Sequence, residues 1–154
     1  MCESEPAIML VYRRMHAAEA EAAAQLHRRV DRAAWPWTPD LSTPAAEIAM
    51  YRDTVFTGGA VIGAFGGDVL RGFIATIPGW IEHLYVDVDF QGLGIGSGLL
   101  EQAMSSADDL QLWTCQANTA TRRFYQRHGF IVAELTDGAS LAEREPNVRY
   151  RWHR

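Results

Sequence analysis

The spacing of apolar residues predicts alternating strands and helices in the first half of the chain. Residues 7–15 form a short apolar run typical of a strand, and the alanine-rich residues 16–30 are typical of a helix. Three further apolar segments, with a glycine-rich turn between the first two, predict an antiparallel meander over residues 60–68, 69–77 and 81–88. The chain therefore opens with a strand and a helix and continues into a sheet.

The second half continues the alternation. Residues 95–107 place apolar side chains three or four positions apart, which predicts an amphipathic helix. An apolar strand at 110–115 and a helix at 119–128 follow, and the patterns at 130–135 and 148–152 are typical of two closing strands. The second half therefore adds three strands and two helices.

A proline-containing segment separates the first helix from the meander. Pro36, Pro39 and Pro44 predict an irregular loop that leads into a short helix ending at Arg52. The whole pattern predicts an α/β fold of mixed α+β type, with one mixed, mostly antiparallel sheet of six to seven strands flanked by about four helices. With 154 residues, the chain fits a single domain over residues 1–154, and residues 1–6 are expected to be a flexible tail.

Composition and charge exclude several classes of function. The net charge of −5 gives no field that would attract nucleic acid or an anionic membrane, and no apolar run approaches the roughly 18 residues of a membrane span. The five histidines lack metal-ligand spacing, so no metal site is expected. Two cysteines without a C-x-x-C pair, and an acidic start unlike a secretory signal, favour the cytoplasm. The absence of lysine excludes a P-loop and lysine Schiff-base chemistry.

Four glycines at alternate positions precede the helix at 95–107. Glycine costs about 0.5–1 kcal/mol relative to alanine inside regular structure, so Gly92, Gly94, Gly96 and Gly98 indicate that something approaches the backbone closely. A helix N-terminus with unpaired N–H groups is a binding site for phosphate. The spacing does not fit the dinucleotide fingerprint, which needs glycines at i, i+2 and i+5. A turn that only packs a helix tightly against a strand is the alternative.

A second informative segment is NTATRRFYQRHGF, residues 118–130. Asn118 is a favourable N-cap, and Gly129 is expected to end the helix. Tyr125 follows Phe124 and points about 100° away from it, so it need not belong to the buried face. The alternative for Tyr125 is a partly buried tyrosine at a helix end.

Together, these two segments resemble a known family. Residues 91–96, QGLGIG, resemble the Q/R-x-x-G-x-G/A acyl-CoA motif of the GNAT superfamily of N-acetyltransferases, and residues 118–130 resemble its N-x-x-A/R-x-x-F-Y-x-x-x-G-F segment. The two motifs occur in the family's order, and the similarity extends over essentially the whole chain. It implies an acetyl-CoA-dependent N-acetyltransferase that acetylates a primary amine by direct attack. It also implies a sheet splayed between its fourth and fifth strands.

The resemblance implies where coenzyme A binds. The pyrophosphate would rest on the backbone amides of residues 92–97, with the Gln91 side chain beside them, and the pantetheine arm would bond to the backbone of the strand at 81–88. Arg122 and Arg123 would reach the adenosine phosphates, with two solvated arginines on a helix surface as the alternative. Gly98 lies beyond the motif and is expected to serve helix packing. The coenzyme-binding residues implied are Leu84, Tyr85, Val86, Gln91, Gly92, Leu93, Gly94, Ile95, Gly96, Ser97, Asn118 and Tyr125.

The resemblance also implies the catalytic groups. Tyr125 matches the family tyrosine that protonates the departing thiolate, and a phenol with a pKa near 10 keeps its proton at neutral pH. Glu82 is the candidate base, because strict alternation places it on the strand face of Leu84 and Val86. Trp80 and Trp113 occupy the positions of the base in other members, which leaves Glu82 or a water route. A salt-bridged strand glutamate is the alternative for Glu82.

The acceptor amine is less constrained by the sequence. An aromatic, acidic pocket for a cation could be formed by Trp35, Trp37, Glu82, Glu143 and Glu145, and ordinary surface positions are the alternative for these residues. The partners expected are a coenzyme A thioester and an amine, either a small molecule or a peptide, with a homodimer left open. A non-catalytic acyl-CoA sensor or interaction module is the competing function.

Overall fold

A computed structural model of the chain describes residues 9–37, 42–138 and 145–154. The tail expected at residues 1–6 and the candidate acceptor residue Glu143 lie outside the described residues. Within the described ranges, no helix combines the length and apolar composition that crossing a bilayer requires.

The expected strands and helices are present. The strands are β1 (Leu10–Arg14), β2 (Ala60–Gly66), β3 (Val69–Ile77), β4 (Trp80–Val86), β5 (Asp109–Cys115), β6 (Ile131–Thr136) and β7 (Asn147–His153). The helices are α1 (Ala20–Ala34), α2 (Pro44–Met50), α3 (Phe56–Gly58), α4 (Ile95–Ser105) and α5 (Thr119–Arg127), with a π-helical turn (Tyr51–Val55) between α2 and α3. Short 3₁₀ turns precede α1 (Ala17–Glu19) and follow β4 (Val88–Phe90).

The first helix begins later than its sequence predicts. The Glu19 carboxylate accepts a hydrogen bond from the His16 amide at 3.0 Å and pairs with Arg13 at 2.8 Å. This cap stabilises a separate 3₁₀ turn, so α1 begins at Ala20 in place of residue 16. The helix also extends beyond its predicted end at residue 30 to Ala34.

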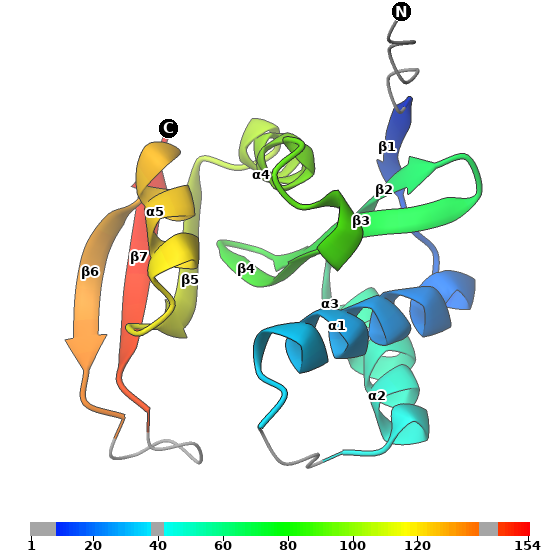
Figure 1. Cartoon of the computed structure of the whole chain (residues 1–154). Coiled ribbons are helices and arrows are strands. Elements are labelled where there is room, and N and C mark those ends of the chain that lie inside the picture. Colours follow the sequence, from blue (N-terminus) through cyan, green and yellow to red (C-terminus); the bar gives the residue numbers. More distant parts are fainter. Residues whose placement is uncertain (1–8, 38–41, 139–144) are drawn as a thin grey trace, which may run out of the picture.

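All seven strands form one sheet in the order β1-β2-β3-β4-β5-β7-β6. Every neighbouring pair is antiparallel except β4 and β5, which are parallel and meet at one residue pair, Trp80 opposite Gln111. The Gln111 amide also donates to the Gly79 carbonyl at 2.9 Å. Beyond this point the two strands diverge, so the mixed sheet and the splay between the fourth and fifth strands are confirmed (Figure 1).

Helices cover both faces of the sheet (Figure 1). Leu99 and Leu100 of α4 pack with Tyr125 of α5 in one buried core. Leu26 of α1 and Tyr51 pack in a second core on the opposite face. The sheet therefore separates two cores, and the diverging strands β4 and β5 lie between α1 on one side and α4 and α5 on the other.

A β-bulge in β4 contradicts the strict alternation expected there. Ala75 pairs with His83 and Thr76 pairs with Ile81, so Glu82 is an extra residue without a partner in β3. Ile81 consequently packs in the same core as Leu84, three positions away. Strict alternation along β4 therefore fails at Ile81, and the strand face of the exposed Glu82 stays a prediction.

Candidate active site

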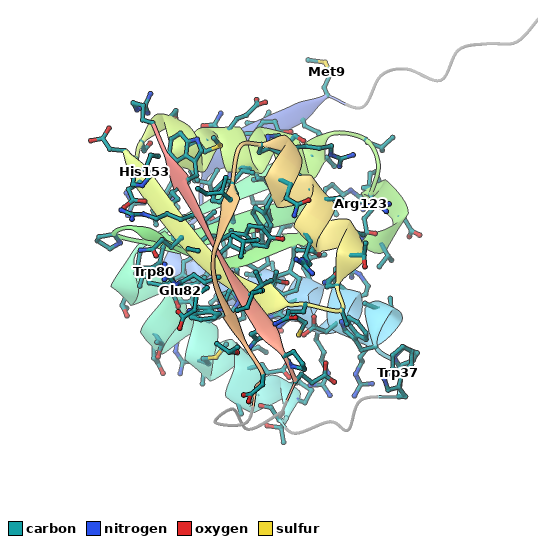
Figure 2. All side chains as sticks on the ribbon, turned by 90° about the vertical axis from the view of Figure 1, so that its left-hand side faces the viewer. Met9, Trp37, Trp80, Glu82, Arg123 and His153 are labelled. Carbon is teal, nitrogen blue, oxygen red and sulfur yellow. The ribbon has the colours of Figure 1, made fainter. Side chains whose placement is uncertain are left out.

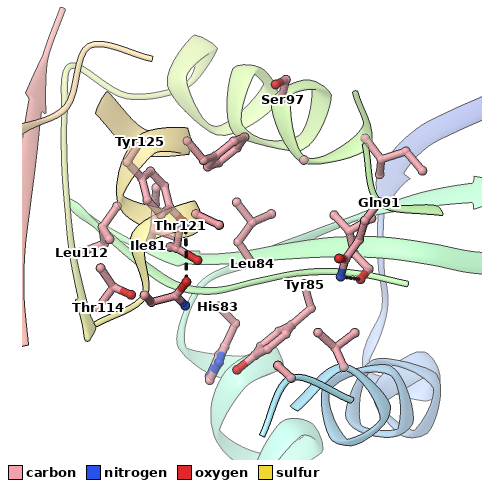
Figure 3. A pocket seen from close by; sticks show the side chains of 18 of the residues that line it. Ile81, His83, Leu84, Tyr85, Gln91, Ser97, Leu112, Thr114, Thr121 and Tyr125 are labelled. Carbon is pink, nitrogen blue, oxygen red and sulfur yellow. Dashed lines mark hydrogen bonds between the residues drawn. The ribbon is translucent and has the colours of Figure 1, made fainter. Parts of the chain in front are cut away.

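A cavity of about 920 Å³ opens where β4 and β5 diverge. Its walls come from these two strands, the loop before α4 and its first turn, α5, and the C-terminal part of α1 (Figure 3). All of the coenzyme-binding residues expected from the sequence line the cavity except Leu93, which is 61% exposed. Tyr125 and Glu82 line it as well. Tertiary folding thus gathers segments that are distant in the sequence.

The glycine-rich loop presents bare backbone to one end of the cavity. Gly92 and Gly94 have φ angles of 79° and 86°, the left-handed region that glycine adopts without strain. The first bond of the helix runs from the Gly98 amide to the Gly94 carbonyl at 3.0 Å, so the preceding amides project from the helix end. A Cβ atom on Gly92 or Gly94 would meet nothing within 4 Å. The loop is therefore shaped to receive a group that approaches its backbone.

A buried carboxylate that the sequence analysis missed anchors this loop. Asp87 is 4% exposed and pairs with Arg29 of α1 at 3.0 Å and Arg71 of β3 at 3.5 Å. Its side chain also caps the 3₁₀ turn at the Asp89 amide. Because a buried carboxylate is costly without partners, these contacts hold the start of the loop against both α1 and β3. The sequence placed no partner near Asp87, since both arginines are distant along the chain.

Two other loop residues play structural roles. The Gln91 side chain donates to the Val86 carbonyl at 3.1 Å (Figure 3), so it ties the loop to β4. A Cβ atom on Gly98 would overlap the hydroxyl oxygen of Tyr12. This contact confirms that Gly98 serves helix packing, because any side chain there would collide with β1.

The α5 wall contains the candidate acid. The Asn118 side chain accepts a hydrogen bond from the Thr121 amide at 3.3 Å, which confirms it as the N-cap (Figure 3). Tyr125 is 5% exposed and packs edge-on against Phe124 and Phe130. Burial raises the pKa of the Tyr125 phenol, so it stays protonated at neutral pH.

The two arginines of α5 have different surroundings. The Arg122 side chain donates to the Tyr150 hydroxyl at 2.9 Å and to the Gln116 carbonyl at 3.2 Å. These bonds direct it to the sheet, which argues against the expected contact with adenosine phosphates. Arg123 is exposed at the surface (Figure 2).

A hydrogen-bonded cluster lies at the side of the cavity nearest α1, where its residues Asp31 and Tyr85 line the wall. The His27 ring contacts the Tyr51 hydroxyl through Nδ1 at 2.5 Å. Its Nε2 contacts both Asp31 and the Tyr85 hydroxyl, each at 2.9 Å. The His83 ring lies 5.4 Å from the His27 ring. Sequence reasoning missed this cluster, although the spacing of His27 and Asp31, four residues apart on a predicted helix, was an available signal.

The candidate acceptor residues only partly come together. Trp35, Trp113 and the exposed Glu82 line the cavity, together with Asp31. Trp37 is 72% exposed and lies far from Glu82 (Figure 2), and neither it nor Glu145 is among the lining residues. Within the described ranges, no three metal-binding side chains converge. This end of the cavity is therefore aromatic and acidic, as expected, but Asp31 and Trp113 line it in place of Trp37 and Glu145.

The half-buried His83 gives stability a pH dependence. Burial, reinforced by the nearby His27, lowers the pKa of His83 from 6.5 to about 4. Between these values the unfolded chain binds a proton at His83 and the folded chain does not, so the free energy of unfolding falls as pH is lowered through this range. The free energy of unfolding is measured by urea denaturation at about pH 7 and at about pH 4.5. We expect the difference between the two values to be smaller in His83→Gln than in the unaltered protein. Exposed His153→Gln is the control, and equal slopes for both variants would contradict the assignment.

A splayed, mixed sheet with a glycine-rich helix N-terminus over its gap defines the class of protein as GNAT-like. The family described as the acetyltransferase (GNAT) domain matches residues 47–132, more than half of the chain. The chain belongs to this family, which places it among the acyltransferases and confirms the resemblance found in its motifs.

Individual relatives are more distant. An uncharacterized N-acetyltransferase of Methanocaldococcus jannaschii is 31% identical over 83 residues, covering 44% of this chain and 37% of that protein. The peptidyl-lysine N-acetyltransferase YjaB of Escherichia coli is 26% identical over 104 residues, covering 54% of this chain and 71% of that protein. The chain therefore matches little more than a third of the archaeal relative.

Solved structures show the same fold. The apo form of Escherichia coli YjaB has a TM-score of 0.74 with 21% identity, covering 94% of this chain and 97% of that one. The PaiA N-acetyltransferase of Thermoplasma acidophilum, solved in complex with coenzyme A, has a TM-score of 0.73 with 18% identity, covering 94% and 99%.

Proposed function

We propose that this protein is an acetyl-CoA-dependent N-acetyltransferase that transfers an acetyl group to a primary amine by direct attack, within the cytoplasm. The observation that carries the proposal is the continuous cavity between β4 and β5, with bare glycine amides at one end and acidic and aromatic side chains at the other. The coenzyme A complex of the structurally similar PaiA enzyme supports the choice of cosubstrate.

The residues present fit coenzyme A. The open space above Gly92 and Gly94 leaves room for phosphates against the backbone, and several converging amides supply the attraction that this acidic chain lacks overall. The divergence of β4 from β5 leaves backbone groups of residues 84–86 available to the pantetheine arm. When bound, acetyl-CoA supplies the activated acetyl group as a thioester.

The side chains supply proton transfer. A primary amine with a pKa near 10.4 costs about 4–5 kcal/mol to make neutral at pH 7. The exposed carboxylate of Glu82, which lines the cavity, is the proposed acceptor of this proton, directly or through water. The Tyr125 phenol holds a proton for the departing sulfur. The backbone N–H near Val86 is the candidate donor to the developing oxyanion.

The proposal is tested by incubating the protein with acetyl-CoA and a panel of primary amines while measuring free thiol. Amine-dependent thiol release is expected. Acetyl-CoA at a hundred times its Kd should also stabilise the fold by about 2.7 kcal/mol and raise the melting temperature, whereas NADH should not. Stabilisation without thiol release from any amine would favour the acyl-CoA sensor, and equal effects of both nucleotides would overturn the coenzyme assignment.

Glu82→Gln tests the proposed base. We expect about tenfold lower kcat near pH 7, because the glutamine cannot accept the amine's proton, with activity recovering as pH approaches the pKa of the amine. Coenzyme A affinity should be unchanged. Exposed Glu101 of α4 lies away from the cavity, so Glu101→Gln is the matched control. A loss of equal size at every pH would show that Glu82 positions the substrate without acting as a base.

A further inference from the structure

The hydrogens in the His27 cluster can be assigned from its bonding. A carboxylate accepts hydrogen bonds and donates none, so the 2.9 Å contact between Asp31 and the His27 Nε2 atom requires a hydrogen on Nε2. Tyr51 is fully buried, and the His27 ring is its only hydrogen-bond partner among the described residues. Its hydroxyl therefore donates to Nδ1, since its hydrogen would otherwise be buried without a partner.

This assignment leaves the hydroxyl hydrogen of Tyr85 unused. Because Nε2 already carries a hydrogen, the Tyr85 oxygen can only accept from it across their 2.9 Å contact. Burial raises the pKa of Tyr85, so the phenol keeps its own hydrogen at neutral pH. No second partner for this hydroxyl occurs in the described parts of the chain. The cluster thus holds an oriented hydrogen-bond donor.

The donor lies on the wall of the proposed acceptor end. Tyr85 and His83 extend from β4 toward α1, and Leu84 extends to the opposite side (Figure 3). Asp31 also lines the cavity, with half of its side chain exposed. Because Asp31 and the Tyr85 hydroxyl each lie 2.9 Å from the same nitrogen, they are separated by at most twice that distance.

We propose that Tyr85 donates a hydrogen bond to an oxygen of the acceptor, and that the site selects primary amines whose amine-bearing carbon also carries a carbonyl or hydroxymethyl group. This inference rests on the proposed N-acetyltransferase function. Asp31 and Glu82 attract the ammonium group, and Tyr85 receives the oxygen a short distance away. An amine at the end of a long methylene chain, such as a lysine side chain, would leave the Tyr85 donor unpaired, which costs affinity in a desolvated site.

The test compares amines with and without this oxygen. The probes are alaninamide, alaninol, the isostere of alaninamide in which an isopropyl group replaces the carboxamide, and an Nα-acetylated lysine amide. For each amine, kcat/KM of the Tyr85→Phe variant is divided by that of the unaltered protein, so the intrinsic reactivity of the amine cancels. We expect a drop of about tenfold for alaninamide and alaninol and little change for the other two amines.

Tyr12→Phe is the matched control, because Tyr12 does not line the cavity. An equal drop in kcat/KM for all four amines with Tyr85→Phe, or no drop for any, would overturn the inference.

A second experiment needs no substitution and applies if Tyr85→Phe folds poorly. It compares how strongly two acetylated products inhibit the unaltered protein. Acetylated alaninamide should inhibit about tenfold more strongly than its acetylated isopropyl isostere, and equal inhibition would overturn the inference. Thiol release from none of the four amines would overturn the proposed function itself.

Discussion

Tyr125→Phe is expected to lower kcat by about 10²–10⁴-fold while leaving coenzyme A affinity almost unchanged. The substitution removes one hydroxyl and keeps the ring that packs against Phe124 and Phe130. If this hydroxyl protonates the departing thiolate, its removal raises the free energy of the transition state and leaves the free energy of coenzyme A binding almost unchanged. The defect should shrink with an acyl donor whose thiol has a lower pKa, because a better leaving group needs less protonation.

Tyr150→Phe is the matched control for this prediction. Tyr150 is fully buried near Tyr125, and its hydroxyl accepts hydrogen bonds from Arg122 and Gln126. Its loss should reduce the free energy of unfolding by about 1–3 kcal/mol with kcat retained. The Tyr125 hydroxyl has no hydrogen-bond partner among the described residues, so Tyr125→Phe should change stability little. A Tyr125→Phe variant with normal kcat and weaker coenzyme binding would contradict the acid assignment.

Gly94→Val is expected to weaken coenzyme A binding at least tenfold. Its Cβ would enter the open space at the helix N-terminus, where the pyrophosphate is proposed to lie, and a branched side chain is strained at a φ of 86°. Isothermal titration with coenzyme A gives the affinity, and urea unfolding gives the stability of the same variant.

Gly67→Val separates these two effects. Gly67 lies in the turn between β2 and β3 with a φ of 61°, and a Cβ atom there would meet nothing within 4 Å. It does not line the cavity, so valine there should cause comparable backbone strain with normal coenzyme A affinity. Unchanged coenzyme A affinity in Gly94→Val, or an equal loss of affinity in both variants, would contradict the proposed phosphate site. The glycines would then serve only to pack the helix against the sheet.

The sequence predicted the order of the elements and the two segments that carry the motifs. Local patterns suffice for these features, because Asn118 caps its own helix and Gly92 and Gly94 adopt their positive φ angles within one short loop. The later start of the first helix, caused by the 3₁₀ turn that Glu19 stabilises, also has a local cause. Strict alternation failed between Ile81 and Leu84, because a bulge depends on pairing with β3 and leaves no periodic signal.

The residues at the aromatic, acidic end of the cavity were harder still to predict from the sequence. The sequence gathered Trp35, Trp37 and Glu82 by residue type, whereas the fold places Asp31, Tyr85 and Trp113 around the cavity and leaves Trp37 at the surface. The His27 cluster joins α1, the π-helical turn after α2, and β4, so no local pattern contains it.

By itself, the sequence determined the family, the glycine-rich form of the loop before α4 and the position of the candidate acid, because each depends on residues close together in the chain. Tertiary structure alone decided that β7 inserts between β5 and β6, that Asp87 is buried between Arg29 and Arg71, and that Tyr85 lines the cavity with its hydroxyl against His27. These features arise from contacts between residues far apart in sequence, whose pairing follows from the packing of the two cores on the sheet.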